Sequence, residues 1–96
     1  MIKVPVVNRK DYTMYLELHD GFLWFHSDVH KWTSQVKTKY LGDLHLLQYL
    51  TDVPVLALID EDNKKLAKFA QTIGFEFKQP FLGQDKKMYH IYSRSL

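Results

Sequence analysis

Three side chains that can exchange protons alternate along one short segment of the chain: His26, Asp28 and His30. If a β-strand ran through this segment, its period of two would project all three onto one face. Two imidazoles and a carboxylate suit a zinc ion, and they also suit a general base with a group that orients it. If the strand stops before His30, that residue lies in a loop and the three ligands have no independent scaffold. We therefore predict no metal site, and we take His26 or Asp28 as the candidate general base.

Two further charged clusters could serve as binding sites. The run Asp60–Asp62 could hold a divalent cation through its oxygens. Such a run is more typical of the first turn of a helix, where it complements the helix dipole, and we predict that role. Lys31, Lys37 and Lys39 surround a predicted helix N-terminus, where they could attract phosphate groups. Alternatively they form a solvated helix face, and the sequence leaves both interpretations open.

Length and composition set the frame for these residues. The chain has 96 residues, 13 basic and 11 acidic side chains, 14 aromatic residues counted as six Phe, six Tyr and two Trp, and no Cys. We predict one domain over residues 1–96 with an aromatic-rich core. The nearly balanced charge argues against nucleic acid as a partner. The sequence has no apolar run that could span a membrane and no signal segment, and the lack of Cys fits a reducing compartment, so we expect a cytoplasmic protein.

The first third of the chain has the pattern of three strands. Ile2–Val7 is β-branched but interrupted by Pro5, which favours an edge strand. Apolar and polar residues alternate over Tyr12–Leu18, and a second apolar run covers Phe22–Ser27. Gly21 lies in the turn between these two runs, where it tolerates a positive φ, and we predict a β-hairpin.

The middle of the chain predicts a helix and a buried strand. Thr33 and Ser34 are candidate N-caps, and the helix runs to about Leu50. Its inward side chains follow helical spacing: Val36, Tyr40, Leu44 and Leu47. Val53–Ile59 is a continuous apolar run, typical of a strand buried on both faces.

The last third predicts a second helix and two closing strands. This helix starts in the acidic run and ends at Gly74. Its predicted inner stripe consists of Leu66, Phe69, Ala70 and Ile73. Phe75–Lys78 and Met88–Ser93 have the pattern of strands. The resulting order, β-β-β-α-β-α-β-β, predicts an α/β sheet that is parallel in its middle and antiparallel at its ends.

From about Phe22 onward the chain resembles the C-terminal half of the GNAT family of N-acetyltransferases. In that family an Asn opens the last helix and a Gly-Phe pair closes it, and Asn63, Gly74 and Phe75 match this spacing. The stretch 23–40 looks closest to small GNAT-like proteins of short-tailed bacteriophages. The resemblance covers most of the chain and implies a GNAT-like mixed sheet that lacks the N-terminal helices of the full fold.

The resemblance also implies acetyl-CoA as cofactor and an amine as acceptor. The amine would meet the thioester along the strand Phe22–Val29, where a backbone N–H would stabilise the oxyanion and His26 or Asp28 would remove the proton through water. The residues that the resemblance places on the coenzyme side are Ser27, Val29, Gln35, Lys37, Thr38, Lys39 and Asn63.

Two positions depart from the family pattern. The family's phosphate-binding loop is Gln/Arg-x-x-Gly-x-Gly/Ala; Gln35 matches its start, but Thr38 and Tyr40 stand on the glycine positions. The family also commonly has a Tyr seven residues after the Asn, as general acid for the thiolate, and Ala70 stands there. These departures predict a catalytically weakened or degenerate enzyme.

Two functions from different classes therefore follow from the sequence. The first is an N-acetyltransferase homologue of the phage type. The alternative is a non-catalytic protein that keeps the fold and binds a host or virion protein. A homo-oligomer is compatible with either function.

Overall fold

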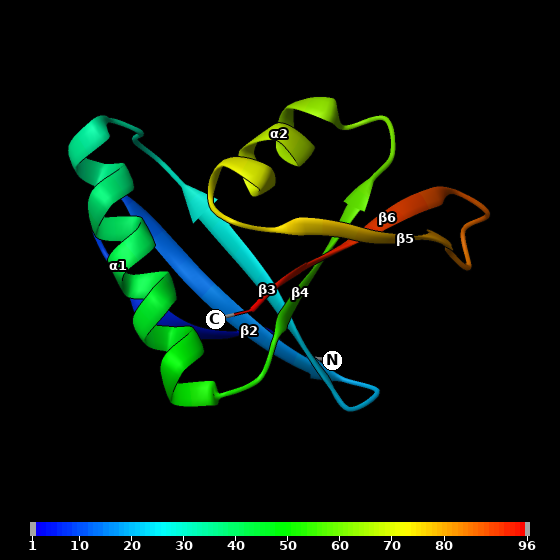
Figure 1. Ribbon diagram of the computed structural model, residues 1–96, viewed down its shortest axis with the longest axis horizontal. Coiled ribbons are helices and arrows are strands. Elements are labelled where there is room, and N and C mark those ends of the chain that lie inside the picture. The colour runs from blue at the N-terminus through cyan, green and yellow to red at the C-terminus, as the bar shows by residue number, and fades with distance from the viewer. Residues whose placement is uncertain (1, 96) are drawn as a thin grey trace.

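The computed structural model of the protein describes residues 2–95 and contains six strands and two helices (Figure 1). In chain order they are β1 (Val4–Asn8), β2 (Tyr12–His19), β3 (Phe22–Val29), α1 (Ser34–Thr51), β4 (Val55–Asp60), α2 (Lys64–Thr72), β5 (Glu76–Leu82) and β6 (Met88–Arg94). This order confirms the one predicted from the sequence. Neither helix is long and apolar enough to cross a membrane.

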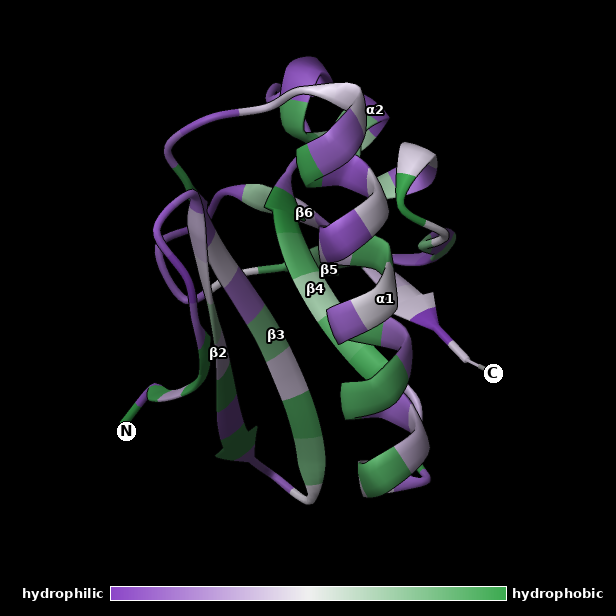
Figure 2. Cartoon of the chain, turned by 90° about the vertical axis from the view of Figure 1, so that its left-hand side faces the viewer, coloured by the Kyte–Doolittle hydropathy of each residue, from purple (hydrophilic) through white to green (hydrophobic). Residues whose placement is uncertain are grey.

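All six strands form one mixed sheet in the order β1-β2-β3-β4-β6-β5. Only β3 and β4 pair in parallel, and the other neighbours are antiparallel. Both helices connect parallel strands, so right-handed crossovers place them on the same face of the sheet. Figure 2 shows α1 lying along β3 and in front of β4. Within residues 2–95, the opposite face of the sheet carries no helix.

The hairpin of β2 and β3 determines which side chains lie on each face. Its two-residue turn, Asp20-Gly21, has φ values of +52° and +79°, as the type I′ turn of a tight hairpin requires. The turn fixes the register, with Met14 opposite Ser27 and Tyr15 opposite His26. Alternation then directs Phe25 and Ser27 toward the helices, and His26 and Asp28 toward the open face.

Helix α1 begins as predicted, because Thr33 is its N-cap and its hydroxyl accepts from the N–H of Val36 at 3.1 Å. The predicted inward residues Val36, Tyr40 and Leu44 are buried, but Leu47 is only half-buried.

The fourth buried side chain of α1 is Gln48, a polar residue that the periodicity of apolar residues could not detect. Gln48 connects α1 to Arg94 in β6 and, through Arg94, to Ile73 at the end of α2. Its Oε1 accepts from Arg94 Nη1 at 2.6 Å, and its Nε2 donates to the carbonyl of Arg94. Arg94 Nε in turn donates to the carbonyl of Ile73 at 2.9 Å. The buried amide is therefore satisfied, and it ties α1, β6 and the end of α2 together.

Helix α2 starts later than the acidic run predicted. Asp60 is the last residue of β4, and its Oδ1 accepts from the N–H of Asp62 at 2.9 Å. The N-cap is Asn63, whose Oδ1 accepts from the N–H of Leu66 at 3.1 Å. The prediction that the acidic run forms the first helical turn is therefore wrong, because a turn closed by Asp60 precedes the helix.

The inner face of α2 has the predicted residues but is less completely buried than predicted. Ala70 and Ile73 are buried, and Phe69 packs against the core while half-buried. Leu66 lies on the same face, where all four residues of the predicted inner stripe line one cleft, but it is 43% exposed because that cleft is open. Gly74, at a φ of +98°, ends the helix as expected.

We expect Leu44→Ala to lower the free energy of unfolding by about 2–5 kcal/mol, because Leu44 is fully buried and its removal leaves a cavity. Leu82→Ala deletes the same atoms from a side chain that is 63% exposed, and we expect a change of about 0.5 kcal/mol or less. Denaturant midpoints at constant m-value measure both. Equal effects of the two substitutions would contradict this assignment of the core.

Candidate functional site

Strands β3 and β4 part after only two paired positions, Leu23 with Val55 and Trp24 with Leu56. Beyond Trp24, β3 keeps its partner β2 on one side, and no strand of the described chain pairs with it on the other. A cleft of about 210 Å³ lies at this gap, and most of its lining comes from β3, β4, α1 and α2, with Lys3 and Phe75 from neighbouring segments. The peptide groups of β3 that face the gap are therefore available to a ligand, as at any unpaired strand edge.

The cleft touches side chains from both faces of β3. Phe25 and Ser27 line it from the helix-covered face, and His26 and Asp28 line it from the open face. The structure thus brings three of the predicted site residues together at one gap: His26, Ser27 and Asp28.

His26 is held by a carboxylate on the neighbouring strand. Its Nε2 lies 2.9 Å from Glu17 Oε1, and the Glu17 side chain is only 15% exposed. When Nε2 carries the hydrogen and donates to Glu17, Nδ1 keeps a free lone pair that can accept a proton. Glu17 also stabilises the charged imidazolium that results. This is the arrangement of a general base with its orienting group.

Asp28 has a different partner. The hydroxyl of Tyr15 donates to Asp28 Oδ2 at 3.0 Å, and this hydrogen bond raises the pKa of Tyr15. The ammonium of Lys3 lies 5.2 Å from the centre of the Tyr15 ring. His26 and Asp28 are therefore each oriented from β2.

Glu17 was not found from the sequence, although the signal was present. The Asp20-Gly21 turn predicts the register of the hairpin, and that register places Glu17 diagonally across from His26. Diagonal neighbours on one face of a hairpin are within reach of long side chains such as Glu.

The helix-covered side of the cleft is occupied by aromatic rings. Tyr40 is fully buried, and its hydroxyl is hydrogen-bonded to the Ser27 hydroxyl at 2.8 Å. Burial raises the pKa of Tyr40 to about 12, so the phenol stays protonated at neutral pH. Trp32 and Phe69 pack edge-on against the Tyr40 ring, with centroids 5.4 and 6.0 Å away. The Tyr40 ring thus fills the space beside β3.

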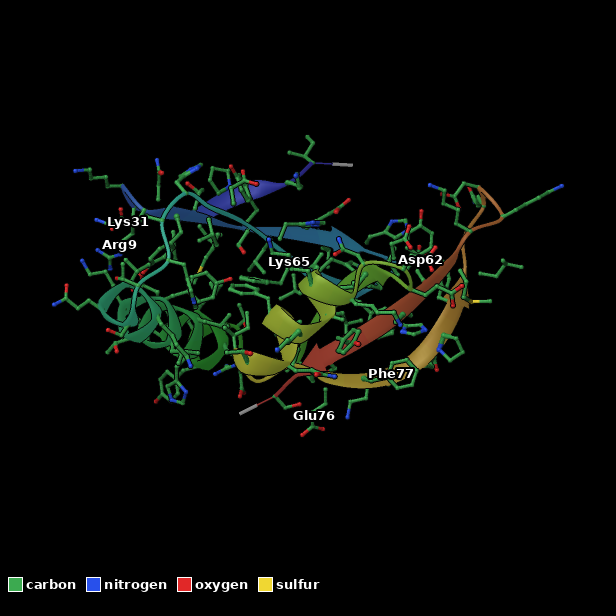
Figure 3. All side chains as sticks on the ribbon, turned by 90° about the horizontal axis from the view of Figure 1, so that it is seen from above. Arg9, Lys31, Asp62, Lys65, Glu76 and Phe77 are labelled. Atoms are coloured by element: carbon green, nitrogen blue, oxygen red, sulfur yellow. The ribbon has the colours of Figure 1, made fainter. Side chains whose placement is uncertain are left out.

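The other predicted coenzyme residues lie outside the cleft lining: Val29, Gln35, Lys37, Thr38, Lys39 and Asn63. Two of these have local structural contacts. Thr38 donates to the carbonyl of Ser34 at 3.1 Å, and Asn63 caps α2. Lys37 and Lys39 lie on the first turns of α1, close to the end where Figure 3 labels Lys31 and Arg9.

The structure does not bring His26, Asp28 and His30 together as metal ligands. Strand β3 ends at Val29, and the backbone N–H of His30 donates to the carbonyl of Asp11 at 2.8 Å, so His30 belongs to a loop. Within residues 2–95, no group of three His, Cys, Asp or Glu side chains is placed to hold a metal ion.

No protein-family model and no curated protein sequence matches this chain. Its fold does match solved structures, among them a protein from Bordetella pertussis assigned to the GnaT-family acetyltransferases. The TM-score is 0.68 at 15% sequence identity, over 95% of this chain. The chain spans 61% of the length of that protein. The comparison confirms the GNAT-like fold predicted from the sequence.

We expect the stability of the protein to fall as pH rises above 10, partly because of Tyr40. The unfolded chain ionises its tyrosines near pH 10, whereas the folded state holds the Tyr40 phenol neutral to about pH 12. The folded state therefore binds more protons than the unfolded state in this range, and stability is lost as pH rises through it. Tyr40→Phe should cost about 1 kcal/mol at neutral pH and give a shallower decline above pH 10. Urea unfolding at several pH values measures both effects.

Tyr49→Phe is the matched control, because Tyr49 is 66% exposed. It should leave the alkaline slope as in the unmodified protein. An alkaline slope identical in Tyr40→Phe and the unmodified protein would contradict the burial of this phenol.

Proposed function

We propose that this protein is an N-acetyltransferase homologue of weak catalytic power that transfers an acetyl group from acetyl-CoA to an amine. The observation that carries the proposal is the gap between β3 and β4, with His26 held by Glu17 at its edge. The GNAT-like fold supports it, since the matched Bordetella pertussis protein is assigned to the acetyltransferases. A cleft of about 210 Å³ is small for a whole ligand and has room for an acyl group.

The residues of the chain supply three parts of this reaction. The unpaired edge of β3 at Ser27 and Val29 offers backbone N–H groups to a carbonyl oxygen. His26 accepts the proton of the amine, directly or through a water molecule, and Glu17 balances the charge. Asp28, oriented by Tyr15, offers a carboxylate to the cationic amine before the proton leaves.

Acetyl-CoA would supply the activated acyl group, and the surface around the cleft fits it in part. Lys37 and Lys39 provide cations for its phosphates near the start of α1, next to Gln35 and Thr38. Against this, the N–H of Val36 is already taken by the Thr33 hydroxyl. We therefore propose that the cofactor is held mainly by side-chain charge, with low affinity.

The weakness of catalysis follows from two positions on the helix-covered side. Ala70 lines the cleft and has no hydroxyl to protonate a leaving thiolate, which would therefore take its proton from water. Losing a general acid typically costs about 10²–10⁴ in rate. The buried Tyr40 ring further restricts how a coenzyme can be positioned, and positioning supplies much of the advantage of acyl transfer.

The packing of Tyr40 favours a second candidate function. Its ring is covered by Trp32 and Phe69 and its hydroxyl is satisfied by Ser27, so the cleft is closed on that side without any ligand. A scaffold that has lost its cofactor would show this packing. In that case the protein binds another protein, and the resemblance to small phage proteins makes a host or virion protein the expected class of partner.

Calorimetric titration with acetyl-CoA separates the two functions. We expect weak binding that decreases at least about tenfold in the double variant Lys37→Glu, Lys39→Glu, because the charge reversal repels the phosphates. The control Lys86→Glu, Lys87→Glu makes the same charge change in the turn between β5 and β6 and should bind normally. Absence of binding to the unmodified protein would favour the non-catalytic function.

We expect His26→Ala to lower kcat for acetyl transfer to a lysine-bearing peptide by about 10²–10⁴, with acetyl-CoA binding unchanged. Glu17→Gln keeps the shape but not the charge and should lower kcat by a smaller factor. The exposed His45 provides the control His45→Ala, which should turn over normally. If binding persists and His26→Ala retains full activity, the base is another group.

A further inference from the structure

The cleft between β3 and β4 contains an amine of the chain's own. Lys3, which precedes β1, lines the cleft together with His26 and Asp28. It is the one lysine of that lining within residues 2–95. Primary amines are the acceptors of the proposed acetyl transfer, so Lys3 belongs to the chemical class that the reaction would consume.

Tyr15 places the Lys3 ammonium beside the candidate base. Lys3 Nζ lies 5.2 Å from the centre of the Tyr15 ring, within the range of a cation–π contact. Tyr15 is directly opposite His26 in the register of the hairpin, and directly opposite residues have Cβ atoms about 4.5–5.5 Å apart. The Tyr15 hydroxyl also donates to Asp28 at 3.0 Å. One aromatic side chain of β2 therefore holds the amine close to both candidate groups of β3.

We propose that Lys3 is a modification site, and that the protein transfers an acetyl group from acetyl-CoA to the Nζ atom of Lys3 in its own chain. This inference rests on the proposed function and names the acceptor of that same site. The Lys3 ammonium gives one proton to water, and the neutral nitrogen attacks the thioester carbonyl carbon. The new N–C bond forms and the C–S bond breaks. The second proton passes from nitrogen to His26 and on to solvent, and the thiolate takes a proton from water.

Attachment to the chain favours Lys3 over a free amine. A tethered acceptor needs no separate binding site, and well-oriented intramolecular reactions can reach effective molarities of about 10⁵–10⁸ M. No ion pair within residues 2–95 includes Lys3. The side chain is exposed, and a cation–π contact at an exposed site is weak, so the ammonium can leave the ring and turn into the gap. A catalyst of low power gains most from such an acceptor, because no second substrate has to be bound.

Incubation with acetyl-CoA and no added amine tests the proposal, with peptide mass spectrometry to locate the acetyl group. We expect about one acetyl group per chain on Lys3, and a rate constant that is independent of protein concentration because the reaction is intramolecular. Lys3→Arg keeps the charge but removes the nucleophile, so the matching release of coenzyme A should disappear. Lys86→Arg makes the same change in the turn between β5 and β6 and is the matched control, which should release coenzyme A normally.

His26→Ala separates catalysed from spontaneous acetylation. It should lower the rate at Lys3 by about 10²–10⁴ and leave the slow background at Lys86 and Lys87 unchanged. Equal labelling of Lys3 with and without His26, or labelling of Lys3 no faster than that of Lys86, would overturn the proposal. A rate constant that rises in proportion to protein concentration would mean transfer between copies and would overturn it as well.

A lysine-bearing peptide distinguishes failure of this inference from failure of the proposed function. Acetylation of the peptide by a protein whose Lys3 stays unmodified would leave the proposed function in place and refute Lys3 as the acceptor. Acetylation of neither the peptide nor Lys3 would refute both.

Discussion

The two halves of the sheet are joined across its middle by only two pairs of residues. One half contains β1, β2 and β3, and the other contains β4, β6 and β5. Leu23 with Val55 and Trp24 with Leu56 are the paired positions that connect them. Backbone pairing this short cannot hold two halves in a fixed orientation by itself. The side chains of the helices must therefore do so, and most features of the molecule follow from this requirement.

Helix α1 is the principal connection, since its inner face contacts both halves. Tyr40 packs edge-on against Tyr12 of β2, with ring centroids 5.0 Å apart, while Gln48 bonds to Arg94 of β6. A second attachment lies on the outside of the first half. Asp43 of α1 accepts from Arg9 Nε and from the Tyr12 hydroxyl, at 2.7 and 2.5 Å. The gap at the far ends of β3 and β4 is thus held open by a helix that is fixed to both sides of it.

Because α1 must hold the two halves of the sheet together, packing and ligand binding make opposite demands on residue 40. A small residue there would leave room for a ligand near β3, but it would remove the ring that fills the space between Tyr12, Trp32 and Phe69. A domain of 96 residues buries a modest fraction of its surface, so the loss of one central aromatic is a large part of its stability. Packing at Tyr40 explains why the departure from the glycine pattern can persist while the fold is kept.

The sequence predicted what depends on neighbouring residues and missed what depends on distant ones. The hairpin turn at Gly21, the cap at Thr33 and the helix end at Gly74 each follow from the conformational needs of one or two residues, and all three are confirmed. β3 changes from apolar residues at 22–25 to polar residues at 26–28 near the point where it parts from β4. The sequence alone did not predict the parting, because a strand that turns polar can equally keep its partner or simply approach its end.

The sequence pattern also could not predict the roles of polar residues whose partners lie far away in the chain. The periodicity of apolar residues assigns a polar residue such as Gln48 to the exposed side of the helix. Gln48 is buried because Arg94, far along the chain, satisfies its amide there. The start of α2 was misplaced for a related reason. Acidic residues suit a helix N-terminus, but Asp60 is held in β4 by its pairing with Tyr89, which delays the helix until Asn63.

A hollow of about 570 Å³, called the trough here, lies over the weakly paired joint of β3 and β4 on the helix-free face of the sheet. Leu23, Trp24 and Leu56 belong to the two paired positions between the halves, and the same three residues line the trough on the helix-free face. The helices stabilise this joint from one side only. Apolar side chains packed into the trough would stabilise it from the other side, because they would contact β3 and β4 together. Any such contact lies at the paired ends of the strands, while the cleft with His26 lies at their parted ends, so covering the trough leaves the cleft accessible. Burial at one end of β3 and β4 would then fix the spacing of the two strands at the end where the chemistry is proposed.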